Sequence, residues 1–482
     1  MLGKEVTMNN SKMILANIGS GSSYLPDIAE MLIERRDTMQ VAEWRLMDKN
    51  EYRLNCTGKY VQKMFADVGM TTKIILTKDL HEAVKDCDHV ISTIRPGKSD
   101  GRYLDETIPF KHGLIGQETT APGGMIMGFK TIPAMLEIAE AIEASAKENC
   151  YLICLANPSG MIAEALSRHS NVKFAGLCNG PTVVRNAMQE IYGGDYAKED
   201  IFVVVIGLNH LIWCKVFIQG HDVTNEAFEK LLDWTAINIP ALRREFVEPA
   251  MQRFIGWIPM GPYLEFYYDY PTSFRDLQSY SGNHWENMVQ HIRKRVGNVV
   301  DDLSMPPNAT RAECVAVIEK RTFELYEKLD PLAYQLAANS RGGKGYGEAG
   351  ITLINAIWNN TNEVLSPDVV SMGCIQDFDP KAVCTTTALV NAAGIYPLAI
   401  SKLPSHIMSK IFAAKEYEKL AVKAAVTGSY HAALEALVAS PLVNSYYNAK
   451  GALDELLIAQ KEFLPQFKDA IEALEKGEPP SN

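Results

Sequence analysis

The stretch MILANIGSGSSYLPDI, residues 13–28, decides the fold of the N-terminal part of the chain. Its apolar half, Met13–Ile18, predicts a short buried strand, and the pattern after Tyr24 predicts a helix to about Arg36. Between them lies the turn Gly19-Ser20-Gly21-Ser22, whose backbone N–H groups and helix dipole can hold a pyrophosphate. Tyr24 stands where a GxGxxG motif has its third glycine, so a tight strand-to-helix turn without a nucleotide stays an alternative.

The second predicted strand supports the nucleotide interpretation. This strand, Trp44–Met47, ends at Asp48, where a carboxylate can accept hydrogen bonds from the ribose hydroxyls of NAD. The same charge would repel the additional phosphate of NADP, although the neighbouring Lys49 weakens that preference. We therefore predict NAD as the cofactor.

Strands and helices alternate over the first 206 residues, which predicts an α/β fold with a Rossmann-like parallel sheet. After about Gly207 the alternation fades and longer helical patterns follow. We predict an NAD-binding domain over 1–206 and a helix-rich α+β domain over 207–482 that completes the metal and substrate site. The strands predicted after Met47 are Lys73–Leu76, His89–Ile94, Tyr151–Ala156, Phe174–Leu177 and Phe202–Ile206.

The composition excludes several classes of partner. The chain of 482 residues is 47% hydrophobic and carries a net charge of −11, which disfavours a nucleic-acid surface. It contains no apolar run long enough for a membrane span, and its first residues do not resemble a signal peptide. Its nine cysteines show no CxxC spacing, which is typical of reduced thiols in a cytoplasmic protein.

Polar clusters follow the predicted strands at the edge where an open α/β sheet binds its ligands. They are Arg95–Lys98, Asn157–Gly160, Cys178–Pro181 and Gly207–His210. Loops that leave a sheet are usually polar, so each cluster is also compatible with an ordinary connection. The same applies to the glycine-rich stretch 116–124, in which Glu118 would then be a solvated loop residue.

Two of these clusters contain candidate metal ligands. A thiolate from Cys178 and an imidazole from His210 would suit a transition metal. Two protein ligands leave coordination positions open for a substrate, as a catalytic metal requires. A single cysteine or histidine is, however, more often a core residue, and spacing alone leaves both interpretations open.

The motifs taken together resemble glycoside hydrolase family 4, whose fold is related to that of the lactate and malate dehydrogenases. The resemblance runs in the expected order through most of the chain. It rests on IGSGSSYLPDI, IRPGKSDGRYLDETIPFKHGLIGQETTAPGG, LANPSGMIAEAL, FAGLCNGP, VIGLNHL, IPMGPYLEFYY and RGGKGYGEAGITLINAI. The IGQETT, CNxP and GLNH elements are far more specific than the glycine turn.

The resemblance implies roles for residues that match the family motifs. It places the metal ligands, with Mn2+ as the expected ion, on Cys178 and His210, and the catalytic tyrosine on Tyr263. Glu118 matches the active-site glutamate of the IGQETT loop. Asn179, which follows the metal cysteine, points to β-linked substrates and is included among the catalytic residues.

Three further residues match positions that contact the sugar: Arg95, Asn157 and Arg341. The resemblance implicates the two arginines in binding a 6-phosphate. The implied substrates are therefore small glycosides, in particular 6-phospho-β-glucosides, and the implied assembly is a homodimer or homotetramer.

The implied reaction is a hydrolysis by transient oxidation. NAD oxidises C3 of the sugar, and the metal then assists a tyrosine in removing the C2 proton. The aglycone leaves, water adds to the double bond, and C3 is reduced again. Family 4 differs in this respect from most glycosidases, which use a pair of carboxylates. The sequence shows no obvious pair of acids of that kind, which agrees with the resemblance.

The sequence departs from the family pattern around the sugar. An NxxNxG segment is missing past the RGG motif, Gly180 replaces a larger residue, and Lys98 stands where glycine is common. A family 4 glycosidase for a non-phosphorylated sugar therefore stays open. A second alternative is an NAD-dependent 2-hydroxy-acid dehydrogenase of the lactate/malate type, to which LANPSG is also similar. Such an enzyme would need neither the Cys178–His210 pair nor Tyr263.

Overall fold

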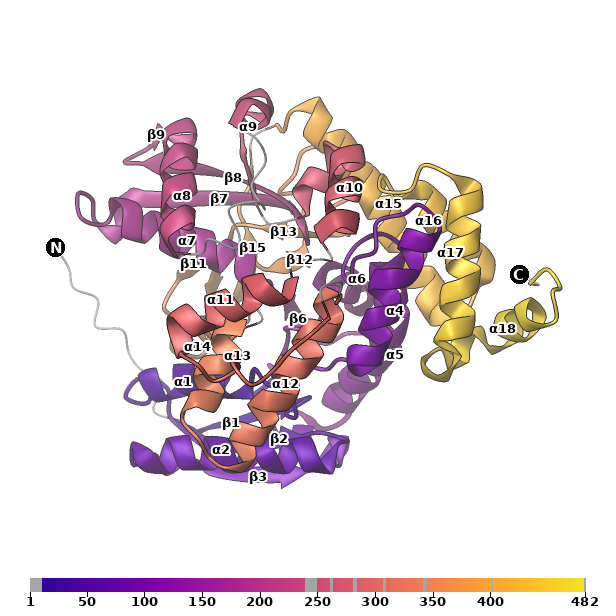
Figure 1. Cartoon of the computed structure of the whole chain (residues 1–482). Helices are drawn as coiled ribbons and strands as arrows, with labels where there is room; N and C mark the ends of the chain where they lie inside the picture. The colour runs from indigo at the N-terminus through magenta and orange to yellow at the C-terminus, as the bar shows by residue number, and fades with distance from the viewer. Residues whose placement is uncertain are drawn as a thin grey trace.

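A computed structural model describes residues 11–238, 249–260, 263–280, 284–306, 309–340, 345–400 and 402–480. The described chain forms one large mixed sheet, a small sheet and helices that cover both faces of the large sheet (Figure 1). No helix in these ranges is both long and apolar enough to cross a membrane.

The N-terminal part of the large sheet is parallel and has the strand order β3-β2-β1-β4-β5-β6. This is the arrangement in which dinucleotides bind across the carboxyl ends of the strands. The predicted parallel α/β fold is therefore confirmed. The strands are β1 (Met13–Ile18), β2 (Val41–Met47), β3 (Lys73–Thr77), β4 (His89–Ser92), β5 (Tyr151–Cys154) and β6 (Lys173–Gly176).

The helices that connect these strands begin where the local chemistry favours a helix. The Asn50 side chain, for example, accepts a hydrogen bond of 3.1 Å from the Arg53 N–H and caps the second helix. The connecting helices are α1 (Leu25–Glu34), α2 (Glu51–Asp67), α3 (Leu80–Val84), α4 (Lys98–Lys111), α5 (Ala121–Ser145) and α6 (Ser159–His169).

Successive residues of the parallel strands point to opposite faces and build two cores. On β5, Leu152 packs in a core formed with α5, α6 and the C-terminal helices, whereas Ile153 packs in a core with α1, α2 and another helix, α14 (Tyr346–Asn359). Both residues are fully buried. The sheet is therefore covered on both sides, as parallel sheets require.

Beyond β6 the large sheet continues with antiparallel strands that, apart from β7, the sequence pattern did not predict. Here β12 pairs with β6, β13 pairs with β12 and β7, and β8 joins β7 to β10, while β9 pairs with β8. The bounds are β7 (Ile201–Leu208), β8 (Leu211–Ile218), β9 (His221–Asp222), β10 (Ile258–Met260), β12 (Asp368–Val370) and β13 (Val383–Thr386). The predicted domain division at residue 206 stays a prediction, and β7 spans that point.

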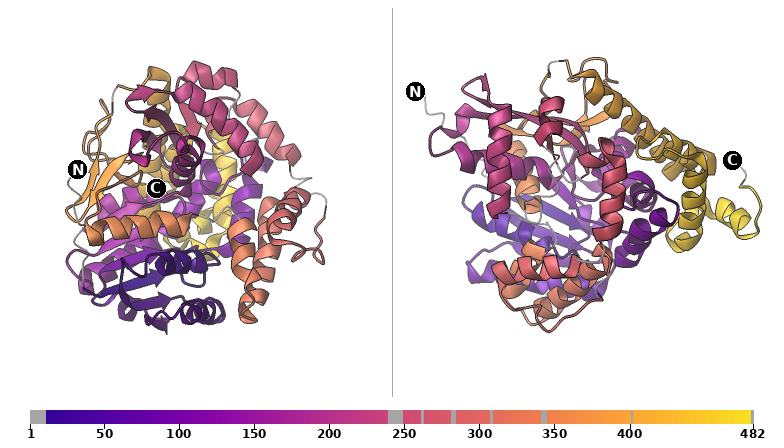
Figure 2. Two further views of the ribbon diagram at one scale, coloured as in Figure 1. Left: turned by 90° about the vertical axis from the view of Figure 1, so that its left-hand side faces the viewer. Right: turned by 45° about the horizontal axis from the view of Figure 1, so that its top comes forward.

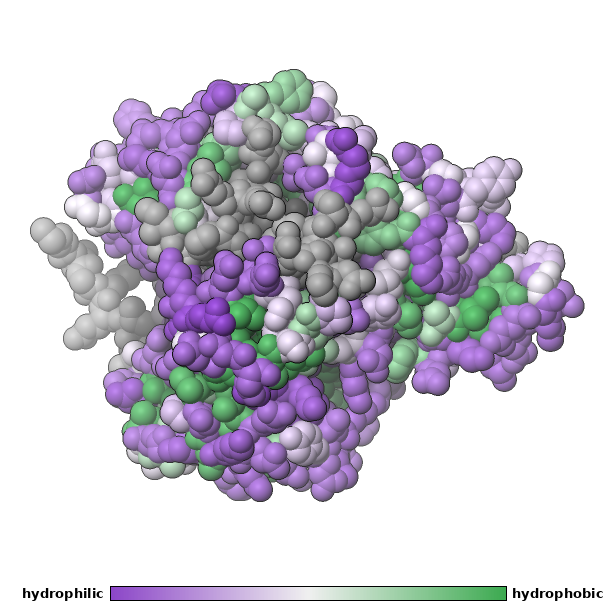
Figure 3. Space-filling view, in the orientation of Figure 1, coloured by the Kyte–Doolittle hydropathy of each residue, from purple (hydrophilic) through white to green (hydrophobic). Residues whose placement is uncertain are grey.

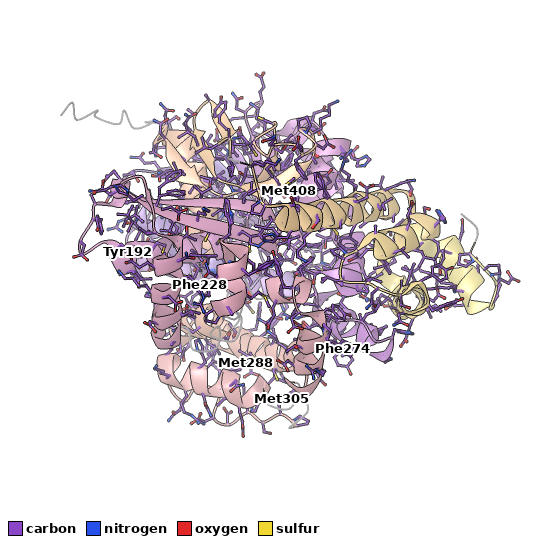
Figure 4. All side chains as sticks on the ribbon, turned by 90° about the horizontal axis from the view of Figure 1, so that it is seen from above. Tyr192, Phe228, Phe274, Met288, Met305 and Met408 are labelled. Atoms are coloured by element: carbon purple, nitrogen blue, oxygen red, sulfur yellow. The ribbon has the colours of Figure 1, made fainter. Side chains whose placement is uncertain are left out.

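The remaining elements surround this extension. The three-stranded sheet has the order β11-β14-β15, with β11 (Glu363–Leu365), β14 (Ala388–Asn391) and β15 (Gly394–Pro397). The helices are α7 (Asn179–Tyr192), α8 (Thr224–Asn238), α9 (Pro249–Ile255), α10 (Tyr270–Tyr280), α11 (His284–Val296), α12 (Arg311–Glu327) and α13 (Leu332–Ser340). Tyr192 of α7 and Phe228 of α8 belong to a separate buried cluster that packs on β7 and β8 (Figure 4).

The C-terminal region is helical, as predicted, and projects to one side of the molecule (Figure 2). It comprises α15 (Ser405–Thr427), α16 (Tyr430–Ala439), α17 (Tyr446–Ala459) and α18 (Lys468–Glu475). A buried ion cluster ties it to the parallel sheet, because the Lys415 ammonium of α15 lies 3.1 Å from the Glu164 carboxylate of α6 and also pairs with Glu418.

Candidate functional site

A cavity of roughly 1350 Å³ lies at the carboxyl ends of the parallel strands, where the strand order predicts a ligand. Hydrophobic residues gather in the middle of the face shown in Figure 3, on an otherwise largely hydrophilic surface. Eleven of the thirteen predicted site residues line this one cavity: Gly19, Gly21, Ser22, Asp48, Arg95, Glu118, Asn157, Cys178, Asn179, His210 and Tyr263. Ser20 is buried beneath it, and Arg341 lies outside the described residues.

The glycine turn packs closely against the backbone of the segment that follows β4. Gly19 has a φ of +90°, and a Cβ atom there would lie 2.7 Å from the Ile94 nitrogen. Asp48 holds the turn from the end of β2, since its carboxylate accepts hydrogen bonds of 2.8 Å from the N–H groups of Gly21 and Asn50. The Ser20 hydroxyl donates to the Asn17 carbonyl at 2.7 Å, so Ser20 supports the turn and does not face the cavity.

Glu118 is buried and paired, in contrast to the solvated loop residue that the sequence also allowed. Its carboxylate pairs with Arg95 and lies 3.1 Å from the Arg102 guanidinium. Burial by itself would raise the pKa of Glu118, but the two guanidinium groups outweigh it and hold the pKa well below its usual range. The stretch 116–124 is also no mere connection, because α5 begins within it at Ala121.

Arg102 and Arg311 also line the cavity, and the sequence motifs gave neither of them a role. Arg102 lies on α4 and bonds to Glu106 at 2.6 Å as well as to Glu118, so carboxylates on both sides neutralise it. Arg311 opens α12 after a capping box formed by Thr310 and Glu313. Arg311 is exposed to the cavity and forms no ion pair with any residue that the structure describes.

The two candidate metal ligands follow β6 and β7, which are separated in the large sheet by β12 and β13. Cys178 follows β6 and caps α7, and His210 lies in the two-residue turn between β7 and β8 with a φ of +63°. The Nε2 atom of His210 is buried and has no hydrogen-bond partner among the described residues. Burial lowers the pKa of His210 to about 4, so at neutral pH the imidazole has a free lone pair for a cation.

The Cys178 side chain is half-buried, and this burial raises the pKa of its thiol to about 11. A bound cation would favour the thiolate over the thiol and so reverse this effect. Within the described ranges, no cluster of three or more Cys, His, Asp or Glu side chains is arranged to hold a metal. The chemistry of a thiolate and an imidazole fits a metal that has two protein ligands and completes its coordination with a substrate.

Tyr263 lies beside the candidate metal ligands. Its ring centroid is 4.9 Å from that of His210 and 5.6 Å from that of Phe266. Asn179, the first residue of α7, lies next to Cys178, with 3.8 Å between its Oδ1 atom and the thiol sulfur. The phenol of Tyr263 thus lies beside the imidazole of His210, the amide of Asn179 lies beside the thiol of Cys178, and all four residues line the same cavity.

Comparison with known proteins identifies the family. Residues 14–193 match the protein family described as "Family 4 glycosyl hydrolase", and residues 205–443 match the C-terminal domain of the same family. The chain belongs to glycoside hydrolase family 4. It is therefore a glycoside hydrolase, and this assignment replaces the alternative function of a 2-hydroxy-acid dehydrogenase.

Similar proteins extend over almost the entire chain. A probable 6-phospho-beta-glucosidase of Bacillus subtilis is 33% identical over 464 residues, which cover 95% of this chain and 99% of that protein. A 6-phospho-beta-glucosidase of Escherichia coli is 29% identical over 478 residues, 97% of this chain and 100% of that protein.

A solved structure of the 6-phospho-beta-glucosidase from Thermotoga maritima has a TM-score of 0.78 to this family 4 protein at 28% identity, and the match covers 94% of this chain and 99% of that one. That structure contains manganese, NAD+ and glucose-6-phosphate. The match covers most of both chains, so the two proteins share the same fold.

The pairing of Glu118 predicts a pH-dependent contribution to stability. E118Q removes the charge that faces Arg95 and Arg102, and we expect it to lower the free energy of unfolding at pH 7 by about 3 kcal/mol. Because the pKa of Glu118 is lowered by folding, its contribution is complete above the ordinary pKa and is lost as the pH falls through the lower folded value. The difference between wild type and E118Q should therefore shrink below about pH 4.

Urea unfolding over a pH series measures this effect. E51Q is the control, since Glu51 forms an exposed pair with Lys78 and its loss should leave stability nearly unchanged. Equal stability of E118Q and wild type at pH 7 would contradict the assigned ion pairs.

Proposed function

We propose that this family 4 enzyme hydrolyses 6-phospho-β-glucosides with NAD and a divalent metal, in particular Mn2+. The observation that carries the proposal is a single cavity lined by the glycine turn, by Cys178 and His210, and by Arg311, which forms no ion pair among the described residues. The relatives named above as 6-phospho-beta-glucosidases, and the bound NAD+, manganese and glucose-6-phosphate in one of them, support it.

The nucleotide end of the cavity is assigned to the turn that follows β1. Gly19, Gly21 and Ser22 line the cavity just before the start of α1, where the helix dipole favours the negative charge of a pyrophosphate. Asp48 supplies a carboxylate at the end of β2 for the ribose hydroxyls, and its negative charge favours NAD over NADP.

The metal end is assigned to Cys178 and His210. The buried Nε2 atom of His210 has no hydrogen-bond partner among the described residues, and desolvating such an atom costs free energy unless it bonds to a donor or a cation. A soft thiolate and an imidazole suit a first-row transition metal. When bound, the metal and NAD would supply Lewis-acid and redox chemistry at C2 and C3 of the sugar.

The residues around the metal end would handle protons and orient the sugar. Tyr263, whose ring lies 4.9 Å from that of His210, would take the C2 proton, and a nearby cation would make its phenol acidic enough to do so. Asn179 and Asn157 present amide groups that can bond to sugar hydroxyls. Glu118 holds Arg95 and Arg102 in place, which fixes the charged wall of the cavity.

We propose Arg311 as a phosphate-binding residue in addition to the two arginines that the family motifs indicate. Glu118 already neutralises Arg95, so Arg95 is a weaker candidate for the sugar phosphate than the sequence suggested. Arg311 faces the cavity without an ion-pair partner among the described residues and can bind a phosphate through two N–H groups. We therefore assign the 6-phosphate to Arg311, while the role of Arg341 stays a prediction.

Two further expectations stay proposals. Nine free cysteines, eight of them buried, support a reducing, cytoplasmic location. A homodimer or homotetramer is expected from the family resemblance.

The function is tested with p-nitrophenyl 6-phospho-β-glucoside in the presence of NAD+, Mn2+ and a reductant. We expect release of p-nitrophenol that is lost without NAD+ and lost in EDTA, because each supplies part of the chemistry. The unphosphorylated glucoside is the matched control and should react at least tenfold more slowly. Equal rates on the two would indicate a glycosidase for a non-phosphorylated sugar, and cleavage that persists in EDTA without NAD+ would refute the mechanism.

The metal assignment is tested by C178A. Removal of one of two protein ligands should abolish Mn2+ binding, measured by electron paramagnetic resonance, and leave NAD+ binding by calorimetry unchanged. C214A is the control, since Cys214 is buried in β8 and does not line the cavity. Wild-type Mn2+ affinity in C178A would show that Cys178 is not a ligand.

The phosphate assignment is tested by R311M. Loss of a bidentate charged contact costs about 1.5–3 kcal/mol, so we expect KM for the phosphorylated substrate to rise at least tenfold. Arg321 lies on the same helix and pairs with Asp302 away from the cavity, so R321M should leave KM unchanged. An unchanged KM in R311M, or an equal rise in R321M, would contradict the assignment.

A further inference from the structure

Two aromatic side chains line the cavity between the glycine turn and the candidate metal ligands. Tyr24 follows the turn and Tyr346 opens α14, and their rings stack with 5.8 Å between centroids and 26° between planes. The sequence motifs give neither residue a role, and Tyr24 is notable there only because it breaks the GxGxxG pattern. The two tyrosines are 322 positions apart in sequence, so only the tertiary structure brings them together.

Contacts at both ends fix the position of this pair. The Gly347 N–H donates a hydrogen bond of 2.7 Å to the buried Asp27 carboxylate, which ties the first turn of α14 to α1 directly after Tyr24. On the other side, a Cβ atom on Gly345 would lie only 3.9 Å from the Cβ of Asn179. Tyr346 therefore lies between α1 and the residue that follows Cys178.

The surroundings of the pair are apolar. Ile18, Ile28 and Leu155 line the same part of the cavity and are at least nine-tenths buried. Tyr346 packs against the core that contains Ile28 and Leu155. Burial raises the pKa of Tyr346 well above its usual value, and the neighbouring Cys178 thiol acts in the same direction, so the phenol stays neutral. The wall thus offers flat, uncharged surface to a ligand.

The strand order determines which part of a dinucleotide would reach this wall. Along the carboxyl edge of the sheet, Asp48 follows β2, the glycine turn follows β1, and Cys178 follows β6. A dinucleotide with its ribose at Asp48 and its pyrophosphate at the turn must direct its remaining half toward Cys178. That half carries a planar aromatic ring, which can pack against aromatic and aliphatic side chains.

We propose that the Tyr24–Tyr346 pair is the wall of the nicotinamide subsite and positions the ring to face the Cys178–His210 end of the cavity. Both tyrosines are positioning residues, and their rings matter more than their hydroxyls. The inference rests on the proposal that NAD occupies the cavity.

The test compares binding of NAD+ and ADP-ribose, which lacks nicotinamide, by titration calorimetry on wild type, Y346L and Y346F. We expect Y346L to weaken NAD+ binding about tenfold, the equivalent of roughly 1.4 kcal/mol, and to leave ADP-ribose binding within about twofold of wild type. Y346F retains the ring and should bind both ligands as wild type does. If Y346L fails to fold, Y24L tests the same pair through its other ring. We expect Y24L to weaken NAD+ binding and to leave ADP-ribose binding nearly unchanged.

Three results would overturn the proposal. These are an equal loss of affinity for both ligands, unchanged NAD+ binding in both leucine variants, and a loss in Y346F as large as that in Y346L. An absence of NAD+ binding in the wild type would instead contradict the proposed function, so the two failures are distinguishable.

Discussion

The site depends on two short strands that lie between β6 and β7 in the large sheet. Asp368 of β12 pairs with Gly176 of β6 and with Thr385 of β13, which in turn pairs with Gly207 of β7. The Asp368 carboxylate is buried and accepts hydrogen bonds from the hydroxyls of Thr385 and of Ser159, the latter at 2.5 Å. Because β12 and β13 join β6 to β7, the segments that carry Cys178 and His210 leave the sheet into the same cavity.

The charged side chains that line the cavity differ in whether an opposite charge neutralises them. Glu118 and Glu106 neutralise Arg95 and Arg102, and this network makes one wall rigid. Behind it, the Lys130 ammonium bonds to Asp105 at 2.8 Å and to Gln460 at 2.6 Å, so the segment after α17 supports the same wall. A buried charge is tolerated only when it is paired in this way. Arg311 forms no ion pair among the described residues, which leaves it to an anionic substrate.

Aromatic residues contribute the neutral surface that such a charged cavity also needs. Tyr263 lies against His210 at the metal end, and the Tyr24–Tyr346 pair lies between that end and the glycine turn. The cavity is therefore lined in succession by charged side chains, by the His210 imidazole and by the stacked phenols of Tyr24 and Tyr346. This succession matches the parts of a dinucleotide and a sugar phosphate bound side by side.

The sequence by itself determined the parallel sheet, the glycine turn, the helical C-terminal region and, through motifs, eleven of the residues that line the cavity. Local periodicity and turn chemistry suffice for these features, because they depend on neighbours in the chain. It could not show that Glu118 is buried between two arginines, that Arg311 forms no ion pair with another described residue, or that Tyr24 stacks on Tyr346. These features depend on the tertiary structure. Both the pairing of β12 and β13 with distant strands and the burial of charge arise from contacts between segments that lie far apart in the sequence.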